Sequence, residues 1–105
     1  MSFLSNLFGG SQFSPIQEIQ DHLKAGAIIL DVRTEQEFAS GSVSGALNIP
    51  VQVIEQFIND IRKHEKPVVV FCRSGARAST AMSILNQAGL TTVNAGGLAD
   101  MRQLV

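Results

Sequence analysis

One short segment of the 105-residue chain combines residue types that can support chemistry on an anion. The segment Cys72-Arg-Ser-Gly-Ala-Arg77 holds the one cysteine of the sequence together with two arginines and a glycine. A thiolate is a strong nucleophile, and nearby positive charge or a helix N-terminus favours it over the thiol. Gly75 allows the backbone to curl so that successive N–H groups converge on one point, as in an anion-binding nest. The spacing therefore predicts that Cys72 is a nucleophile in an anion-binding loop.

The ordinary alternative for Cys72 is a core cysteine that packs as a small hydrophobe. Two arginines and a glycine directly after it argue against that alternative, because a core position has no use for them. A lone cysteine cannot form an internal disulfide, which indicates a reducing compartment or a chemically used thiol. His22 and His64 fall at polar helical positions, so we do not expect a Cys–His pair of the protease kind.

The elements around this segment must place the thiol between a strand and a helix. Residues 68–71 form a continuous apolar run typical of a strand buried on both faces, and an amphipathic helix is predicted over 77–88. Further strands are predicted at 27–32 and 91–94, and helices after Ser14, at 34–40, at 51–61 and at 98–103, with a turn at Gly96-Gly97. This alternation indicates an α/β fold with a mostly parallel sheet, whose ligands bind at the carboxyl ends of the strands.

Three blocks of the sequence resemble the rhodanese family of sulfurtransferases. They are the Cys72–Arg77 loop, the stretch Leu30-Asp-Val-Arg-Thr-Glu-Gln-Glu-Phe38 with Gly41-Ser-Val-Ser-Gly-Ala-Leu-Asn-Ile-Pro50, and Gly96-Gly97. Ser42 stands where the family often has histidine, and Met101 lies near the place of a frequent aromatic residue. The resemblance covers roughly residues 13–103 and implies a rhodanese-like fold, a mostly parallel central sheet with helices on both faces. It also implies ping-pong transfer of sulfur through a Cys72 persulfide, without metal or organic cofactor.

The resemblance assigns roles to the residues of the loop and to a second strand end. Cys72 is the expected catalytic residue. The expected substrate-binding residues follow it directly: Arg73, Ser74, Gly75, Ala76 and Arg77. Arg77 is the arginine expected to face an anionic donor, whereas Arg73 has the alternative of pairing with a carboxylate elsewhere. Asp31 and Arg33, at the end of the other buried strand, are candidate pocket-lining residues. Their alternative is a structural ion pair, for example between Arg33 and Glu37.

The composition of the chain limits the kinds of partner that we expect it to bind. The formal net charge is −1 and no run of like charge occurs, so no nucleic-acid footprint is expected. No stretch approaches the roughly 20 apolar residues of a membrane span, and we expect a cytoplasmic protein. The expected partners are a small-molecule sulfur donor and a thiol or cyanide acceptor, with a protein donor or acceptor as a further option. We expect a tail over residues 1–12 and one domain over 13–105; the tail's apolar side chains are candidates for docking on the domain or a partner: Phe3, Leu4, Leu7 and Phe8.

Two other functions fit parts of the pattern. Cysteine phosphatases also hold a thiolate in a nest closed by arginine, but their loop has five residues between Cys and Arg, and four separate Cys72 from Arg77. A shorter loop favours a single sulfur over a phosphoryl group. The second alternative is a non-catalytic sulfur carrier or interaction module that receives persulfide sulfur from a partner protein.

Overall fold

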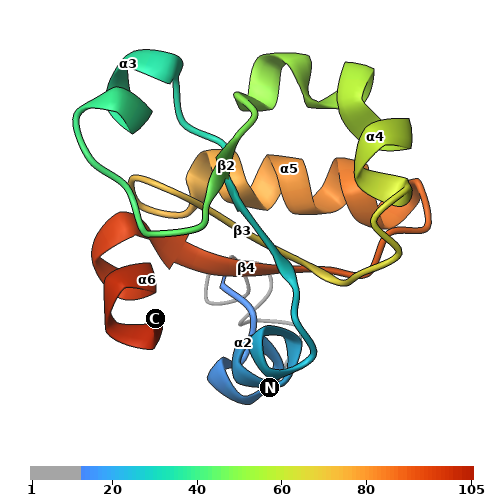
Figure 1. The fold of residues 1–105 in the computed structure, drawn as a ribbon, viewed down its shortest axis with the longest axis horizontal. Coiled ribbons are helices and arrows are strands. Elements are labelled where there is room, and N and C mark those ends of the chain that lie inside the picture. The colour runs from blue at the N-terminus through green and yellow to red at the C-terminus, as the bar shows by residue number, and fades with distance from the viewer. Residues whose placement is uncertain (1–12) are drawn as a thin grey trace, which may run out of the picture.

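The sheet at the centre of the molecule is parallel throughout. In the computed structural model, which describes residues 13–105, four strands lie in the order β2-β1-β3-β4 (Figure 1). Their bounds are β1 Ile28–Asp31, β2 Leu47–Asn48, β3 Val68–Cys72 and β4 Thr92–Gly97. Strand β1 pairs with β3 residue by residue, and Asp31 lies beside Phe71. The carboxyl ends of β1 and β3 therefore meet at one edge, as the sequence predicts.

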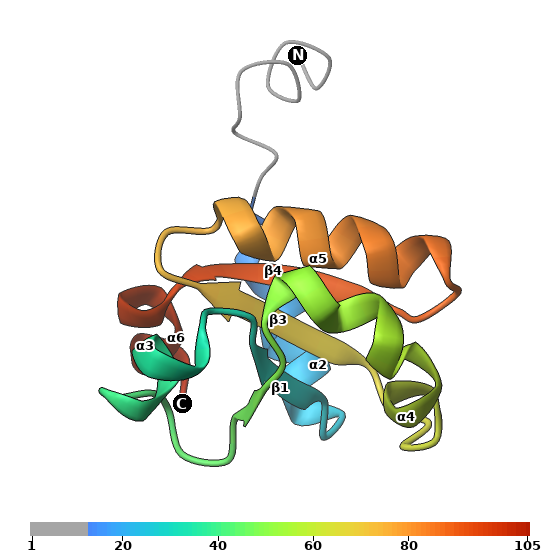
Figure 2. The ribbon, with the colours of Figure 1, turned by 90° about the horizontal axis from the view of Figure 1, so that it is seen from above.

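Helices cover both faces of the sheet, which confirms the predicted α/β architecture. The helical segments are α2 Ile16–Lys24, α3 Glu35–Ala39, the 3-10 segment η1 Val51–Phe57, α4 Ile58–Arg62, α5 Ala76–Gln87 and α6 Leu98–Leu104. In Figure 1, α4 and α5 lie above the strands and α2 and α6 below them. Figure 2 shows the carboxyl ends of β3 and β4 pointing to the side where α3, α6 and the β3–α5 loop gather.

Each face has its own apolar core because the side chains of β3 alternate between the two faces. Val68, Val70 and Cys72 belong to the cluster that packs against α5, η1 and α4, whereas Val69 and Phe71 belong to the cluster under α2 and α6. Full burial of one Val or Phe side chain stabilises the folded state by about 1.5–3 kcal/mol. Strand β3, buried at all five positions, is thus a rigid support for the residue that ends it.

Two local predictions about the ends of elements need correction. Ser14, followed by Pro15, is predicted to cap the first helix, but it does not. Helix α2 begins at Ile16, and the Ser14 hydroxyl accepts a hydrogen bond from the Asn94 N–H at 2.9 Å. Gly96 and Gly97 belong to β4 and form no separate turn. Three steps along β4, from Asn94 to Gly97, match two along β3, from Val70 to Cys72, so the glycines accommodate a β-bulge.

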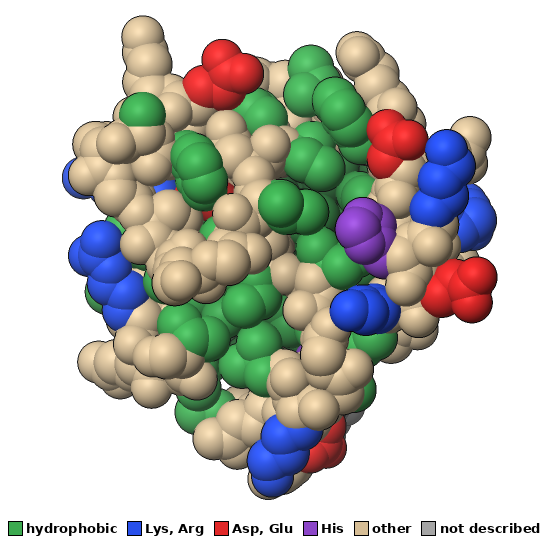
Figure 3. All heavy atoms as spheres, in the orientation of Figure 1, with side chains coloured by type: hydrophobic (Ala, Val, Ile, Leu, Met, Phe, Trp, Pro, Cys, Tyr) green, Lys and Arg blue, Asp and Glu red, His purple; other side chains and the backbone are tan. Residues whose placement is uncertain are grey.

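Other local predictions are confirmed, with one change of helix type. The sequence places Glu37 three residues after Thr34, which predicts a capping box, and Thr34 caps α3 in a capping box with Glu37. The helix predicted over 51–61 exists, but its first part, Val51–Phe57, is a 3-10 segment. In the face drawn in Figure 3, hydrophobic side chains gather centrally and charged ones lie mostly around them. Within residues 13–105, no helix has both the length and the apolar character needed to cross a bilayer.

Candidate active site

Cys72 is the last residue of β3, and its sulfur lies against the start of α5. The residue is 1% exposed. Its Sγ accepts hydrogen bonds from the N–H of Gly75 at 3.0 Å and from the N–H of Ala78 at 3.3 Å. Both donors belong to the turn that begins α5, where the unpaired amides and the helix dipole favour negative charge. Two amides thus donate to a sulfur that lies between an apolar strand and a helix, which is the placement that the sequence predicts; the role of Cys72 as a nucleophile stays a prediction.

Gly75 makes this turn possible. It precedes α5 with φ of 106° and ψ of −16°, a left-handed conformation that side chains disfavour. Its carbonyl accepts the N–H of Ser79 at 2.9 Å, which starts the helix. Within the described part of the chain, the N–H groups of Ala76 and Arg77 make no hydrogen bond. Two free amides therefore remain beside the two that already bind the sulfur.

The arginines of the loop have different surroundings. Arg77 binds Glu37 of α3 through two hydrogen bonds, Nη1 to Oε1 at 2.7 Å and Nη2 to Oε2 at 3.1 Å. These bonds, followed by that from the Thr34 N–H, lower the pKa of Glu37 from 4.5 to about 2. The pKa of Arg77 is raised, first by its bond to Glu37 and further by the charges of Cys72 and Asp31. Arg77 therefore adds positive charge near the sulfur while its guanidinium stays attached to α3.

Arg73 is exposed and forms no ion pair with any residue from 13 to 105. The alternative of a carboxylate partner elsewhere is thus wrong for the described part of the protein. Ser74 and Ala76 are also exposed, and Gly97 lies so close that a Cβ there would come within 2.2 Å of the Arg73 carbonyl oxygen. The loop is therefore fixed by its backbone and presents its side chains outward.

Asp31 and Arg33 form a buried ion pair with each other. Arg33 Nη2 lies 2.6 Å from Asp31 Oδ2, and the residues are 6% and 0% exposed. Arg33 Nη2 also donates to the Gly41 carbonyl at 2.7 Å, and Ser42 donates to Asp31 Oδ2 at 2.8 Å. The suggested pairing of Arg33 with Glu37 is wrong, since Asp31 lies on the same strand end and reaches the guanidinium first. The pair anchors the segment that follows α3; a role in lining the pocket stays a prediction.

Sequence reasoning missed Asn94, which is fully buried within β4. Its Nδ2 donates to the Gly75 carbonyl at 3.1 Å and its Oδ1 accepts from the Gly96 N–H at 2.8 Å. A polar residue between apolar Val93 and Ala95 was the available signal. The partnership of Glu37 with Arg77 was also missed, because the sequence pattern pairs Glu37 only with the nearby Thr34 and Arg33, whereas Arg77 lies 40 positions away.

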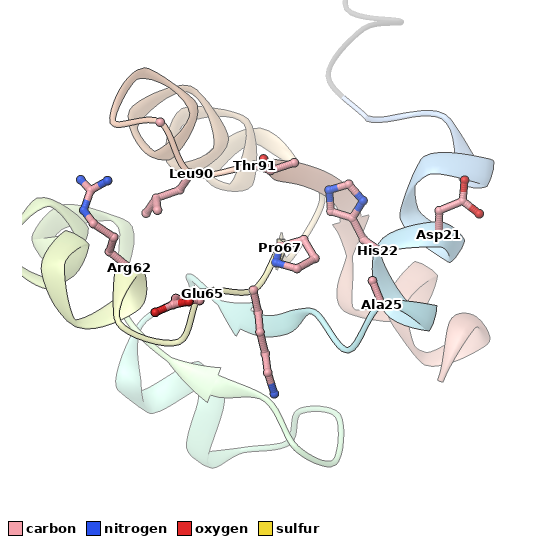
Figure 4. A pocket seen from close by; sticks show the side chains of 10 residues that line it. Asp21, His22, Ala25, Arg62, Glu65, Pro67, Leu90 and Thr91 are labelled. Atoms are coloured by element: carbon pink, nitrogen blue, oxygen red, sulfur yellow. The ribbon is translucent and has the colours of Figure 1, made fainter.

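A large hollow of the described protein lies away from Cys72. It measures about 590 Å³ and is lined by residues that precede the strands, among them Ala25, Pro67 and Thr91 (Figure 4). His22 also lines it; it is half-buried where a surface position was expected, and its Nε2 has no partner among the described residues. This hollow is at the opposite end of the sheet, so it is not the site of the thiol. No group of three or more His, Cys, Asp or Glu within residues 13–105 is arranged to hold a metal ion.

Comparisons with known proteins agree with this geometry. The family model of the rhodanese-like domain matches residues 15–103. The chain belongs to the rhodanese-like family. Its rhodanese-like relatives include a sulfurtransferase of Allochromatium vinosum, 39% identical over 59% of this chain and 57% of that protein. The thiosulfate sulfurtransferase PspE of Escherichia coli is 36% identical over 69% of this chain and 71% of that protein.

Solved rhodanese structures support the same assignment. A human single-domain sulfurtransferase is 29% identical with a TM-score of 0.68, covering 88% of this chain and 96% of that one. A rhodanese with anions from Escherichia coli is 33% identical with a TM-score of 0.63, covering 70% and 89%. An uncharacterized Bacillus subtilis protein is 35% identical over 70% of this chain. The chain spans 60% of the length of that protein and 57% of the Allochromatium one. Rhodanese-type sulfurtransferases act on small sulfur donors and acceptors, and nothing in the family match indicates nucleic acid or membrane binding.

Proposed function

We propose that this protein is a sulfurtransferase that carries sulfane sulfur as a persulfide on Cys72. The donor is thiosulfate or a persulfide, and the acceptor is cyanide or a thiol. The observation that supports this most directly is the environment of Sγ, which accepts hydrogen bonds from the amides of Gly75 and Ala78. Two neighbouring amides have no hydrogen-bond partner among residues 13–105. Such a nest suits an anionic sulfur that gains one more sulfur atom during the reaction.

In the first half-reaction the Cys72 thiolate attacks the outer sulfur of thiosulfate. A sulfur–sulfur bond forms to Sγ while the bond between the outer sulfur and the sulfonate sulfur breaks. The electron pair of that bond leaves with sulfite, so three negative charges enter and three remain, one on the persulfide and two on sulfite. No oxidant or proton is consumed.

In the second half-reaction an acceptor nucleophile attacks the terminal sulfur of the persulfide. With cyanide the products are thiocyanate and the original thiolate, and with a thiolate acceptor the sulfur leaves as a new persulfide. The unbonded amides of Ala76 and Arg77 are the proposed donors to the terminal sulfur. Donors of this kind typically contribute about 2.7–4 kcal/mol each to a transition state.

The two arginines of the loop have different proposed electrostatic roles. Arg73, exposed and unpaired within residues 13–105, is suited to attract an anionic donor to the loop. Arg77, held by Glu37, is suited to stabilise charge at the sulfur without moving. A reducing compartment such as the cytoplasm fits a protein whose single thiol must stay free. The proposed domain spans residues 13–105; its proposed tail, with the docking candidates Phe3, Leu4, Leu7 and Phe8, lies outside the described residues.

The test is sulfur transfer itself. The protein mixed with thiosulfate and cyanide should release thiocyanate, and mass spectrometry after thiosulfate alone should find the Cys72 peptide one sulfur atom heavier. Cys72→Ser keeps the size of the side chain and should abolish both signals while its thermal melting stays close to that of the unchanged protein. Full activity in the Cys72→Ser variant would exclude this mechanism.

A second candidate, a sulfur carrier loaded by a partner protein, has one observation in its favour. Both guanidinium branches of Arg77 are engaged by Glu37, which leaves less positive charge free for a small anion than a loop with an unpaired arginine. A carrier should load rapidly from a cysteine desulfurase and slowly from thiosulfate. Faster loading from thiosulfate would favour the enzyme.

A further inference from the structure

The side chain of Asn94 links strand β4 to the loop that follows Cys72. Its Nδ2 donates to the Gly75 carbonyl and its Oδ1 accepts from the Gly96 N–H. The two ends of one amide thus hold two glycine backbones from opposite sides. The amide cannot be reversed without placing oxygen against the Gly75 carbonyl, so the orientation of this side chain is determined.

Asn94 is itself held firmly. Its backbone exchanges hydrogen bonds with Ser14, whose N–H donates to the Asn94 carbonyl at 2.9 Å and whose hydroxyl accepts the Asn94 N–H at 2.9 Å. The ring of Phe13 then lies against the same two glycines: a Cβ on Gly75 would come within 2.2 Å of Phe13 Cε1, and one on Gly96 within 3.0 Å of Cε2. Phe13, in the segment before α2, therefore packs against the loop after Cys72 beside the contact between Asn94 and Gly75.

These contacts act on the donors that face the sulfur. The Gly75 carbonyl shares a peptide group with the Ala76 N–H, and no peptide bond of the described chain is cis. In a planar trans peptide the N–H points away from the C=O. Holding the carbonyl toward Asn94 therefore turns the free Ala76 N–H away from β4. The preceding amide, that of Gly75, is the one that donates to Cys72 Sγ at 3.0 Å.

We propose that Asn94, supported by Phe13, is a positioning residue for the sulfur site, because it holds the peptide group that joins Gly75 to Ala76. This contact keeps the Gly75 amide on the Cys72 sulfur and orients the Ala76 amide for the persulfide that Cys72 would carry. Asn94 touches no reacting atom; it acts through Gly75. The proposal rests on the proposed function for its link to sulfur transfer, but its effect on the thiolate is measurable without any sulfur donor.

The expected effect of Asn94→Ala is a loss of order in the two amides. We expect persulfide loading from thiosulfate to slow by about tenfold, a cost near 1.4 kcal/mol, below that of deleting a donor outright. We also expect the pH midpoint of Cys72 alkylation by iodoacetamide to rise by about one pH unit, because a less stabilised thiolate forms at higher pH. A purely structural role would lower the melting temperature and leave that midpoint unchanged.

Asn86→Ala is the matched control. Asn86 also bridges backbone groups with both ends of its amide, accepting from the Thr92 N–H at 3.0 Å and donating to the Thr92 carbonyl at 3.2 Å. Those contacts lie at the start of β4, at the far end of α5 from Cys72. Asn86→Ala should therefore lose stability without changing the alkylation midpoint or the loading rate.

Phe13→Ala keeps the proposal testable if Asn94→Ala fails to fold. Phe13 is 43% exposed, so its removal leaves the core intact, and Ile16→Ala, at a residue 63% exposed on the same side of the protein, is its control. Phe13→Ala should shift the midpoint in the same direction as Asn94→Ala, and Ile16→Ala should not.

These measurements distinguish the positioning role of Asn94 from the proposed sulfur-transfer activity. A shift of the alkylation midpoint in Asn94→Ala and Phe13→Ala, absent in both controls, supports the positioning role. Midpoints and loading rates equal to those of the controls overturn it, and so does an unchanged Phe13→Ala where Asn94→Ala does not fold. Absence of sulfur transfer in the unchanged protein would instead contradict the proposed function, while the alkylation midpoints would still decide the effect of Asn94 on the thiolate.

Discussion

Replacing Gly75 by alanine tests whether sulfur transfer requires the left-handed turn before α5. At φ of 106° a side chain costs about 1–3 kcal/mol of folding free energy. The new Cβ would also come within 2.2 Å of the Phe13 ring, so either the ring or the loop must shift. If the loop shifts, the Gly75 N–H leaves the sulfur, and losing one such donor costs roughly 2.7–4 kcal/mol, a hundred- to thousandfold in rate.

Gly89→Ala supplies the control at the other end of the same helix. Gly89 has φ of 85°, and a Cβ there would meet no atom within 4 Å. Both variants should lose stability through backbone strain, measured by urea unfolding, but only Gly75→Ala should lose thiocyanate formation. Equal transfer rates in the two variants would refute the idea that the Gly75 amide stabilises the reacting sulfur.

Three further predictions concern charge and loop length. Glu37→Gln should cost under about 1 kcal/mol, because the pair with Arg77 is partly exposed. The pKa of Glu37 is depressed to about 2, so this contribution is present above pH about 4.5 and is lost as the pH falls toward 2; unfolding curves of both proteins across that range should converge at the acid end, and a constant difference would contradict the assignment. Arg33→Met should destabilise the fold by about 3–5 kcal/mol, since it leaves the buried Asp31 carboxylate without its partner, and thermal melting measures this. Inserting one residue after Gly75 should reduce sulfur transfer and introduce phosphate-ester hydrolysis; no gain of hydrolysis would weaken the argument from loop size.

The position of Cys72 was predictable because it depends on local patterns. An apolar run followed by a glycine-containing loop and an amphipathic helix places the thiol at a strand end, and β3 and α5 confirm it. The capping box of Thr34 was predictable for the same reason, since both partners lie within three residues. Patterns of this kind involve residues that are close in the sequence, so they can be recognised without knowing how the elements pack.

Long-range partners were not predictable from such patterns. Glu37 and Arg77 are 40 positions apart and meet because α3 stands over the start of α5. Asn94 and Gly75 are 19 positions apart and meet beside the bulge in β4. The same bulge explains why Gly96-Gly97, which resembles a turn in sequence, continues the strand.

The donors around the sulfur belong to the main chain, whereas the side chains of Arg73, Ser74 and Ala76 face solvent. Substitution of these three side chains is therefore expected to leave the amides in place. Reactivity and selectivity are therefore separable in this loop. Exchange of the outward residues is expected to change which donor or acceptor approaches, without rebuilding the amides that are proposed to stabilise the transferred atom.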